Sequence, residues 1–306
     1  MKTVELENIV KTYATKKSTV TAVDDVSFSV EEGEIFGLIG PDGAGKTSIF
    51  RILTTLLLAD KGSAKVLGYD VEKDYKEIRD IVGYMPGRFS LYQDLTVEEN
   101  LNFFATIFNT TIQENYDLVA DIYKQLEPFK TRRAGKLSGG MKQKLALSCA
   151  LIHKPKILFL DEPTTGVDPV SRKEFWEMLK RLKAQGITIL VSTPYMDEAK
   201  LCDRIALMQN GKILKIDLPQ NIVNEFGKTL YAVRSENMFL LLNDLRAFPQ
   251  TNNCFAFGDN HHLTLKDDGV NISELEKYLI SSGHANATIK KIEPEIEDCF
   301  MQLMKK

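Results

Sequence analysis

The sequence predicts an α/β protein with a central parallel sheet, an antiparallel β-subdomain, a helical insert and a small α+β C-terminal domain. Three observations support this prediction. Short, mostly apolar runs at 34–39, 157–160 and 186–193 are separated by helical patterns, as expected of buried parallel strands. Residues 1–33 instead alternate apolar and polar side chains, which is typical of antiparallel strands. From about residue 227 the pattern changes to β-α-β-β-α-β-α.

That change predicts a first domain over 1–226 and a ferredoxin-like C-terminal domain over 227–306. Within the first domain, residues 96–130 carry a helical pattern with no strand signal. Thr96 and Glu99 have the spacing of a capping box, which marks the start of the first helix of this stretch. We therefore expect a helical subdomain at about 88–155 inserted into the α/β core.

Composition restricts the classes of function. The 306 residues carry a net charge of −3, with 43% hydrophobic and 26% charged residues, so no nucleic-acid partner is expected. The four cysteines form no C-x-x-C pair, which favours a reduced, cytoplasmic setting over a zinc site or disulfide framework. Residues 1–7 are charged too early for a signal peptide. No apolar run approaches ~18 residues, so a membrane role would require a partner.

The stretch 40–48 fits the phosphate-binding pattern G-x-x-x-x-G-K-[ST] and lies between an apolar strand and an apolar-periodic helix. Its residues are Gly40, Pro41, Asp42, Gly43, Ala44, Gly45, Lys46, Thr47 and Ser48. Glycines let backbone N–H groups surround an anion, and the helix N-terminus adds a favourable dipole. Lys46 is placed to reach the β- and γ-phosphates and the Thr47 hydroxyl to ligate Mg²⁺.

The apolar strand at 157–160 ends in two carboxylates, Asp161 and Glu162. Beside a phosphate loop, a carboxylate in the position of Asp161 supplies a further Mg²⁺ contact. Glu162 is placed to orient or deprotonate a water that attacks the γ-phosphate. Acidic residues at strand ends also occur as ordinary helix caps. The intact phosphate loop favours the functional interpretation.

Other candidate positions are weaker when taken alone. Ser138, Gly139 and Gly140 start a helix and form a possible second anion-binding helix end, although such a start is more often a plain cap. Tyr13 could stack on an adenine, but the residues alone favour an ordinary strand aromatic.

Three histidines fall in the C-terminal domain. The adjacent His261 and His262 should point to opposite faces of a strand, which argues against joint metal binding. We expect these two and His284 to lie at the surface.

Taken together, these residues give the first ~220 positions a close resemblance to the nucleotide-binding subunit of an ABC transporter. The phosphate loop at 40–47 and the acidic strand end at 161–162 flank a helical insert. The segment 137–140 matches the family signature Leu-Ser-Gly-Gly, and 164–168 matches the loop that crosses the dimer interface. Details such as 40–43 resemble ABC-2-type exporters, including multidrug exporters.

The resemblance implies that two such subunits sandwich two ATP molecules and drive integral membrane permease subunits from the cytoplasmic face of the membrane. By position, Lys46 and Thr47 would bind phosphate and Mg²⁺, and Asp161 would hold Mg²⁺ through water. Glu162 would be the catalytic base, and Tyr13 would stack on adenine.

In this arrangement each ATP also touches the signature of the other subunit. Ser138, Gly139 and Gly140 would therefore serve the partner's ATP.

The sequence departs from the family pattern at two positions. Gly87 stands where the family has a Gln that contacts Mg²⁺ and the attacking water, and Pro194 where it has a His that contacts the γ-phosphate. We expect neither Gln93 nor His153 to replace these groups. Both losses affect the chain's own ATP site, as in the degenerate half of an asymmetric, heterodimeric pair. The alternative is that the substitutions are tolerated and the site hydrolyses ATP.

Two other functions compete with export. One is a non-transport ABC ATPase acting on ribosomes or DNA, although this chain has one phosphate loop and no heptad run. The other is an ATP-binding regulator that does not hydrolyse ATP. For export, the insert should carry the docking groove for the membrane subunit, with Phe89, Leu91 and Tyr92 as exposed apolar candidates.

Overall fold

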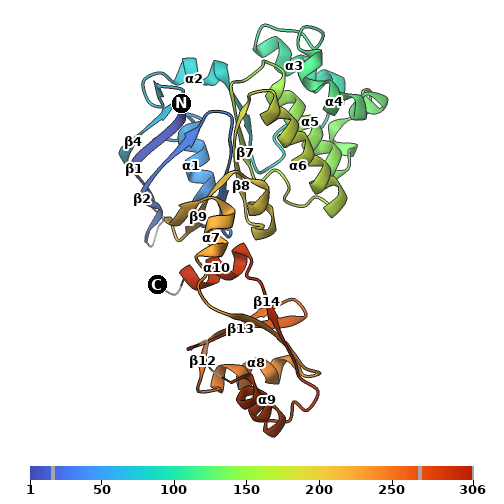
Figure 1. The fold of residues 1–306 in the computed structure, drawn as a ribbon. Helices are drawn as coiled ribbons and strands as arrows, with labels where there is room; N and C mark the ends of the chain where they lie inside the picture. The colour runs from blue at the N-terminus through green and yellow to red at the C-terminus, as the bar shows by residue number, and fades with distance from the viewer. Residues whose placement is uncertain (15–17, 268–270, 305–306) are drawn as a thin grey trace. The chain divides into compact units, whose positions relative to one another are not determined.

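The computed structural model describes residues 1–14, 18–267 and 271–304 (Figure 1). The chain divides into two compact units, Met1–Pro219 and Gln220–Lys306. The helix α7 (Pro219–Asn224) begins at the last residue of the first unit and continues into the second. Among the helices of the described ranges, none has the length and apolar character needed to cross a membrane.

A six-stranded sheet forms the centre of the first unit, in the order β10-β9-β3-β8-β7-β6. All neighbouring pairs are parallel except β10–β9, which is an antiparallel hairpin. β3, β7 and β8 are buried along their whole length, as expected of strands covered on both faces. The strands are β3 (Ile35–Ile39), β6 (Val82–Met85), β7 (Ile157–Asp161), β8 (Thr188–Thr193), β9 (Arg204–Gln209) and β10 (Lys212–Asp217).

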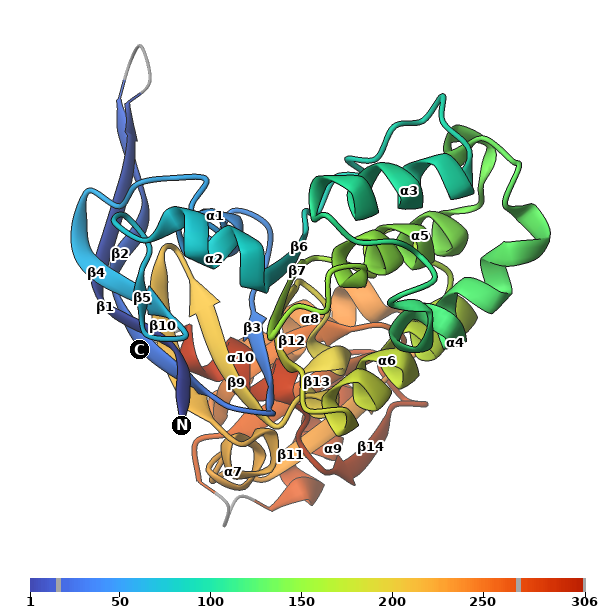
Figure 2. The ribbon, with the colours of Figure 1, turned by 90° about the horizontal axis from the view of Figure 1, so that it is seen from above.

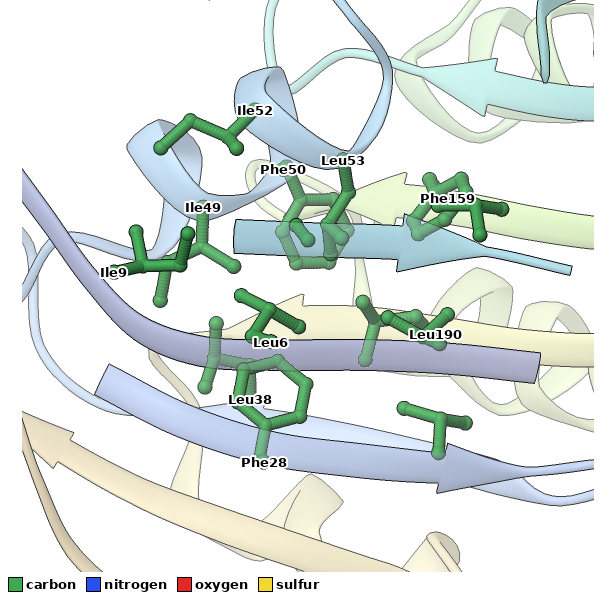
Figure 3. Packing of buried hydrophobic residues seen from close by; sticks show 14 of the residues in the cluster. Leu6, Ile9, Phe28, Leu38, Ile49, Phe50, Ile52, Leu53, Phe159 and Leu190 are labelled. Carbon is green, nitrogen blue, oxygen red and sulfur yellow. The ribbon is translucent and has the colours of Figure 1, made fainter. Parts of the chain in front are cut away.

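An antiparallel sheet in the order β2-β1-β4-β5 forms the predicted β-subdomain. Its strands are β1 (Lys2–Ala14), β2 (Thr19–Glu31), β4 (Lys61–Val66) and β5 (Tyr69–Asp70), and α2 (Tyr75–Ile81) follows them. Helix α1 (Lys46–Leu53) packs between this sheet and the central one (Figure 3). Its fully buried side chains Ile49, Phe50 and Leu53 join both sheets into one core. This packing fixes the start of α1 at the edge of the central sheet.

The helical insert lies on the side of the first unit opposite β1, β2 and β4 (Figures 1 and 2). It contains α3 (Val97–Ile107), α4 (Tyr116–Leu126), short 3₁₀ turns and α5 (Gly139–Leu151). The predicted capping box is confirmed. Thr96 Oγ1 accepts from Glu99 N at 3.2 Å, and Glu99 Oε2 accepts from Thr96 N at 2.8 Å. After β7, α6 (Pro169–Ala184) and the 3₁₀ helix η3 (Met196–Leu201) complete the unit.

The second unit carries an antiparallel sheet in the order β12-β13-β11-β14. The predicted order of elements is present, and this strand order is that of a split β-α-β arrangement. Helices α8 and α9 contribute Leu241 and Leu279 to a core that also contains Val233 of the sheet. The elements are β11 (Leu230–Arg234), α8 (Met238–Ala247), β12 (Thr251–Phe257), β13 (Asn260–Leu265), α9 (Ile272–Ser281), β14 (Thr288–Ile292) and α10 (Ile296–Leu303).

The expectation of surface histidines is wrong for His261 and His284, which are each 4% exposed. His284 has polar partners at both ring nitrogens, whereas His261 has one at Nε2 and, among the described residues, none at its buried Nδ1. His261 Nε2 lies 2.6 Å from Met238 O, and His284 lies 2.9 Å from both Asp244 Oδ2 and Ser235 Oγ. His262 pairs instead with Asp298 at 2.6 Å, which agrees with the opposite faces expected of neighbours on one strand.

Candidate functional site

The loop between β3 and α1 surrounds a cavity of about 330 Å³. Gly43 and Gly45 have φ of +78° and +107°, a backbone region that favours glycine. A Cβ at Gly45 would lie 2.1 Å from Ala22 O, so no side chain fits there. The residues lining this cavity are Ala22, Asp42, Gly43, Ala44, Gly45, Lys46, Thr47, Ser48 and Glu162.

The Lys46 ammonium is the charge that the loop surrounds, and its residue is only 3% exposed. Its Nζ donates to Gly40 O at 2.7 Å and to Pro41 O at 3.0 Å. It also lies 3.1 Å from Glu162 Oε1. A buried charge is stable only with such partners. The phosphates of a nucleotide in this loop would compete with Glu162 for the same ammonium.

The acidic strand end is held by the neighbouring strand β8. Ser192 Oγ donates to Asp161 Oδ1 at 2.7 Å and accepts from Glu162 N at 3.0 Å. Glu162 has a φ of +50°, in the left-handed region that non-glycine residues rarely adopt. This conformation turns the chain sharply after β7 and accompanies the approach of the Glu162 carboxylate to Lys46. Backbone strain of this kind is common where a side chain must reach a functional site.

The predicted metal ligands lie at different depths. Thr47 lines the cavity, whereas Asp161 is 2% exposed and does not line it. Within the described part of the chain, no three His, Cys, Asp or Glu side chains are grouped to hold a metal ion. A hydroxyl and a carboxylate nevertheless suit Mg²⁺, which binds few protein groups and takes its other oxygens from water and phosphate. The donor set therefore fits Mg²⁺ only together with a nucleotide.

Tyr13 is 37% exposed near the end of β1. Its hydroxyl lies 3.1 Å from Ser48 Oγ, so the ring is tied to the first turn of α1. Lys11 Nζ lies 5.9 Å from the centroid of the ring. Tyr13 is thus both a strand aromatic and a partly exposed ring near the phosphate loop, although it does not line the cavity.

The two unusual positions, Gly87 and Pro194, lie beside the acidic strand end and the phosphate loop. A Cβ at Gly87 would be 3.1 Å from Asp161 O and 3.7 Å from Asp161 Oδ2. A side chain at position 87 would therefore begin next to the Asp161 carboxylate. Pro194 directly follows Thr193, whose carbonyl accepts from Gly40 N at 3.2 Å.

Gln93 and His153, which we do not expect to replace the missing Gln and His, lie away from the cavity around Lys46. The Gln93 carbonyl accepts from Gly135 N at 2.9 Å, which joins it to the insert. The His153 ring stacks on Phe108 with centroids 3.8 Å apart, and its Nε2 lies 3.0 Å from Val82 O. Burial lowers the pKa of His153. Neither Gln93 nor His153 lines the cavity around Lys46.

The signature residues form a separate surface at the start of α5. Ser138 Oγ accepts from Met141 N at 3.3 Å and so caps the helix. A Cβ at Gly140 would lie 2.7 Å from Ser171 Oγ, and one at Gly139 would lie 3.3 Å from Gly166 O. Gly140 thus lets α5 approach the first turn of α6 closely, and Gly139 lets it approach the loop that precedes α6. None of the three signature residues lines the cavity around Lys46.

Sequence reasoning missed several polar residues that organise the site. Ser192 and Thr193 end β8 as Asp161 ends β7, and Glu198 follows in η3. Polar side chains at the end of an apolar run were the available signal for the first two. Glu198 has no comparable signal, because its partners are distant in the sequence.

Residues 23–165 match the ABC transporter family. The chain is 39% identical to the probable multidrug ABC transporter ATP-binding protein YbhF of Escherichia coli, over 92% of this chain and 49% of that protein. It therefore spans about half the length of that relative. Linearmycin resistance ATP-binding protein LnrL of Bacillus subtilis is 33% identical over 98% of this chain and 97% of its own length.

Nod factor export ATP-binding protein I of Burkholderia orbicola is 37% identical over 80% of this chain and 81% of that protein. The dimeric post-hydrolysis structure of the ATP-binding cassette MJ0796 with ADP and Pi has a TM-score of 0.64 and 25% identity, and covers 70% of this chain and 98% of that one. The chain therefore belongs to the ABC transporter family, among its ATP-binding proteins.

Proposed function

We propose that this chain is the ATP-binding subunit of an exporter and couples ATP binding and hydrolysis to transport through partner membrane subunits. It would act at the cytoplasmic face of the membrane. The observation that carries the proposal is the buried Lys46 ammonium, held between the glycine loop and Glu162. The names of the relatives, which include multidrug, Nod factor export and linearmycin resistance proteins, support an export role.

In this proposal the loop 40–48 receives the phosphates of ATP. Lys46 would exchange its contact with Glu162 for the β- and γ-phosphates, which frees the Glu162 carboxylate to act as a base. Thr47 and Asp161 are the residues that would hold Mg²⁺, which neutralises phosphate charge when it is bound. Tyr13 would stack on the adenine.

The signature residues would act in a second site. Ser138, Gly139 and Gly140 lie away from the Lys46 cavity, at a helix start where Ser138 and Gly139 are exposed and can contact the ATP of another subunit. The dimeric state of the MJ0796 cassette supports such a pairing. We propose a heterodimer, because this chain would offer an intact signature but an impaired site of its own.

The impairment follows from Gly87 and Pro194. Glycine has no side chain to reach from beside Asp161 toward an attacking water. Proline has neither an N–H nor a polar side chain to contact a γ-phosphate. Each lost contact of this kind costs on the order of 3 kcal/mol, or about a hundredfold in rate. These two residues also favour a second candidate function, an ATP-binding regulator with little hydrolysis.

A groove between β6 and the helical insert is the proposed docking site for a membrane subunit. It has a volume of about 400 Å³, and its walls include Leu56, Tyr84, Phe104 and Ile107. Leu56 and Ile107 are 57% and 53% exposed, so apolar surface is available to a partner. Burial, aided by the Asp161 carboxylate, raises the pKa of Tyr84 to about 12, which keeps the phenol neutral.

The three predicted docking side chains differ in exposure. Tyr92 is 51% exposed and packs edge-on against Phe103, with ring centroids 4.8 Å apart. Phe89 is half-buried near Lys142. The expectation that Leu91 is exposed is wrong, because it is 7% exposed, although it is the one of the three that lines the groove. Of the three, Tyr92 is the most exposed, although it is not among the residues that line the groove.

Lys46→Ala should weaken Mg-ATP binding by at least tenfold, because it removes the cation that faces the β- and γ-phosphates. Lys73→Ala is the matched control, since Lys73 is a surface lysine whose side chain is 82% exposed. Nucleotide titration of both variants measures the difference. Equal affinity in the two variants would show that the loop is not the ATP site.

Tyr92→Glu and Ile107→Glu, the latter in the wall of the groove, should each release the chain from membranes that contain its partner, because a charge would be buried in an apolar contact. Tyr69→Glu changes an aromatic of similar exposure, 40%, on β5 and should leave binding intact. Membrane fractionation and transport assays compare these variants. Full membrane binding and transport in both Tyr92→Glu and Ile107→Glu would place docking elsewhere.

In the assembled transporter, Glu162→Gln should change ATP turnover little, because its site already lacks two contacts. Gly139→Asp should nearly abolish turnover, since it places a charge at the signature that completes the partner's site. The purified chain alone should hydrolyse ATP weakly. Steady-state ATPase assays decide between the two sites. Equal, large losses in both variants would mean that the Glu162 site is active.

A further inference from the structure

We propose that Glu198 is a positioning residue that holds the signature surface and the loop after β7 in register with the phosphate loop. This inference rests on the proposed function, in which the signature surface serves the partner's ATP. Glu198 lies in η3, four residues after Pro194, and is 1% exposed. It is outside the Lys46 cavity and would touch neither nucleotide.

The first contact of Glu198 leads to the phosphate loop. Thr193 Oγ1 donates to Glu198 Oε2 at 2.6 Å. The carbonyl of the same threonine accepts from Gly40 N, the first residue of the phosphate loop, at 3.2 Å. Thr193 is fully buried, so this connection cannot exchange with water. The carboxylate is therefore attached to the end of β8 where β8 meets the phosphate loop.

The second contact leads to the loop that follows the acidic strand end. Thr164 Oγ1 donates to the same oxygen, Glu198 Oε2, at 3.1 Å, and Thr164 is 1% exposed. The Thr164 carbonyl accepts from Val167 N at 3.2 Å and so closes the turn that contains Gly166. The carbonyl of Gly166 faces the signature, since a Cβ at Gly139 would lie 3.3 Å from it.

The third contact leads to α6. Arg172 Nε lies 3.5 Å from Glu198 Oε1 and is the cation that pairs with the buried carboxylate. Arg172 is held in turn by Asp197 at 2.7 Å and lies over the Tyr195 ring at 4.5 Å. Its neighbour Ser171 abuts Gly140, where a Cβ would approach Ser171 Oγ to 2.7 Å. The first turn of α6 therefore transmits the position of Glu198 to the signature.

These contacts place one carboxylate between the two halves of the nucleotide machinery. Two of its contacts, through Thr164 and Arg172, lead toward Gly139 and Gly140, and one leads toward Gly40. Pro194 removes the polar side chain that could tie this segment to the chain's own nucleotide. Since two of the three Glu198 contacts lead to the signature surface, a change at Glu198 should disturb that surface more than the phosphate loop. Misplacement of a catalytic group by about 1 Å can cost on the order of a hundredfold in rate.

The test compares Glu198→Gln with Glu34→Gln in the assembled transporter. Gln keeps the size of the side chain but places a neutral amide against Arg172. Glu34 is also buried, at 9% exposed, and pairs with Arg204 at 3.0 Å next to the start of β3, whereas the phosphate loop follows its end. Glu198→Gln should lower kcat for ATP at least tenfold, with KM changed less than twofold. Glu34→Gln should leave both constants within twofold of wild type.

Thr164→Val provides a second variant that keeps the buried charge and should fold. It removes only the hydrogen bond from Thr164, in the loop after β7, to the Glu198 carboxylate. Like Glu198→Gln, it should lower kcat without changing KM. Equal kcat in Glu198→Gln and Glu34→Gln would overturn the proposal. A loss of ATP affinity in Glu198→Gln that matches its loss of kcat would also overturn it, because the effect would then lie in the phosphate loop.

Hydrogen exchange on the purified chain separates this inference from the proposed function. In Glu198→Gln the amides of 164–172 should exchange at least tenfold faster, while those of 43–50 remain within twofold of wild type. Unchanged exchange in 164–172 would overturn the positioning role, whatever the turnover. A wild-type assembly without ATP-dependent turnover would instead contradict the proposed function, and the exchange result would still decide the role of Glu198.

Discussion

The burial of the Lys46 ammonium is the constraint on which the architecture of the first unit depends. A charge at 3% exposure requires several acceptors, and they come from parts of the chain far apart in sequence. Gly40 and Pro41 supply carbonyls from the loop after β3, and Glu162 supplies a carboxylate from the turn after β7. The three groups meet because parallel strands end at the same edge of the sheet.

Strand β8 lies between β3 and β7 in the sheet and completes this edge. Its last two residues, Ser192 and Thr193, contact different loops. Ser192 holds Asp161 and Glu162, and the Thr193 carbonyl holds Gly40. The chain then continues through Pro194 to Glu198, whose carboxylate accepts a hydrogen bond from the Thr193 hydroxyl. The strand ends are thus joined to one another by short polar contacts. Beside them, Gly87 has no side chain, and Pro194 has neither an N–H nor a polar side chain.

Local signals in the sequence were sufficient for much of the fold. The glycine pattern at 40–48, the capping box at Thr96 and the element order of the second unit each depend on neighbouring residues, so they could be predicted. The partners of Glu198 and of the buried histidines His261 and His284 could not, because they come from distant segments. The left-handed backbone conformation of Glu162 could not be predicted either, since a sequence does not show which non-glycine residue adopts a positive φ.

The central claim is that this site binds nucleotide but lacks two groups needed for efficient hydrolysis. The most direct measurement restores them in a Gly87→Gln, Pro194→His variant of the purified chain, away from the partner's site, and follows ATP hydrolysis with Glu162 intact or replaced by Gln. A Gln at position 87 needs a small adjustment, because its Cβ would lie 3.1 Å from Asp161 O. The account predicts that the double variant hydrolyses ATP at least tenfold faster than wild type, and that Glu162→Gln abolishes this gain. An unchanged rate, or a wild-type rate that already depends strongly on Glu162, would contradict it.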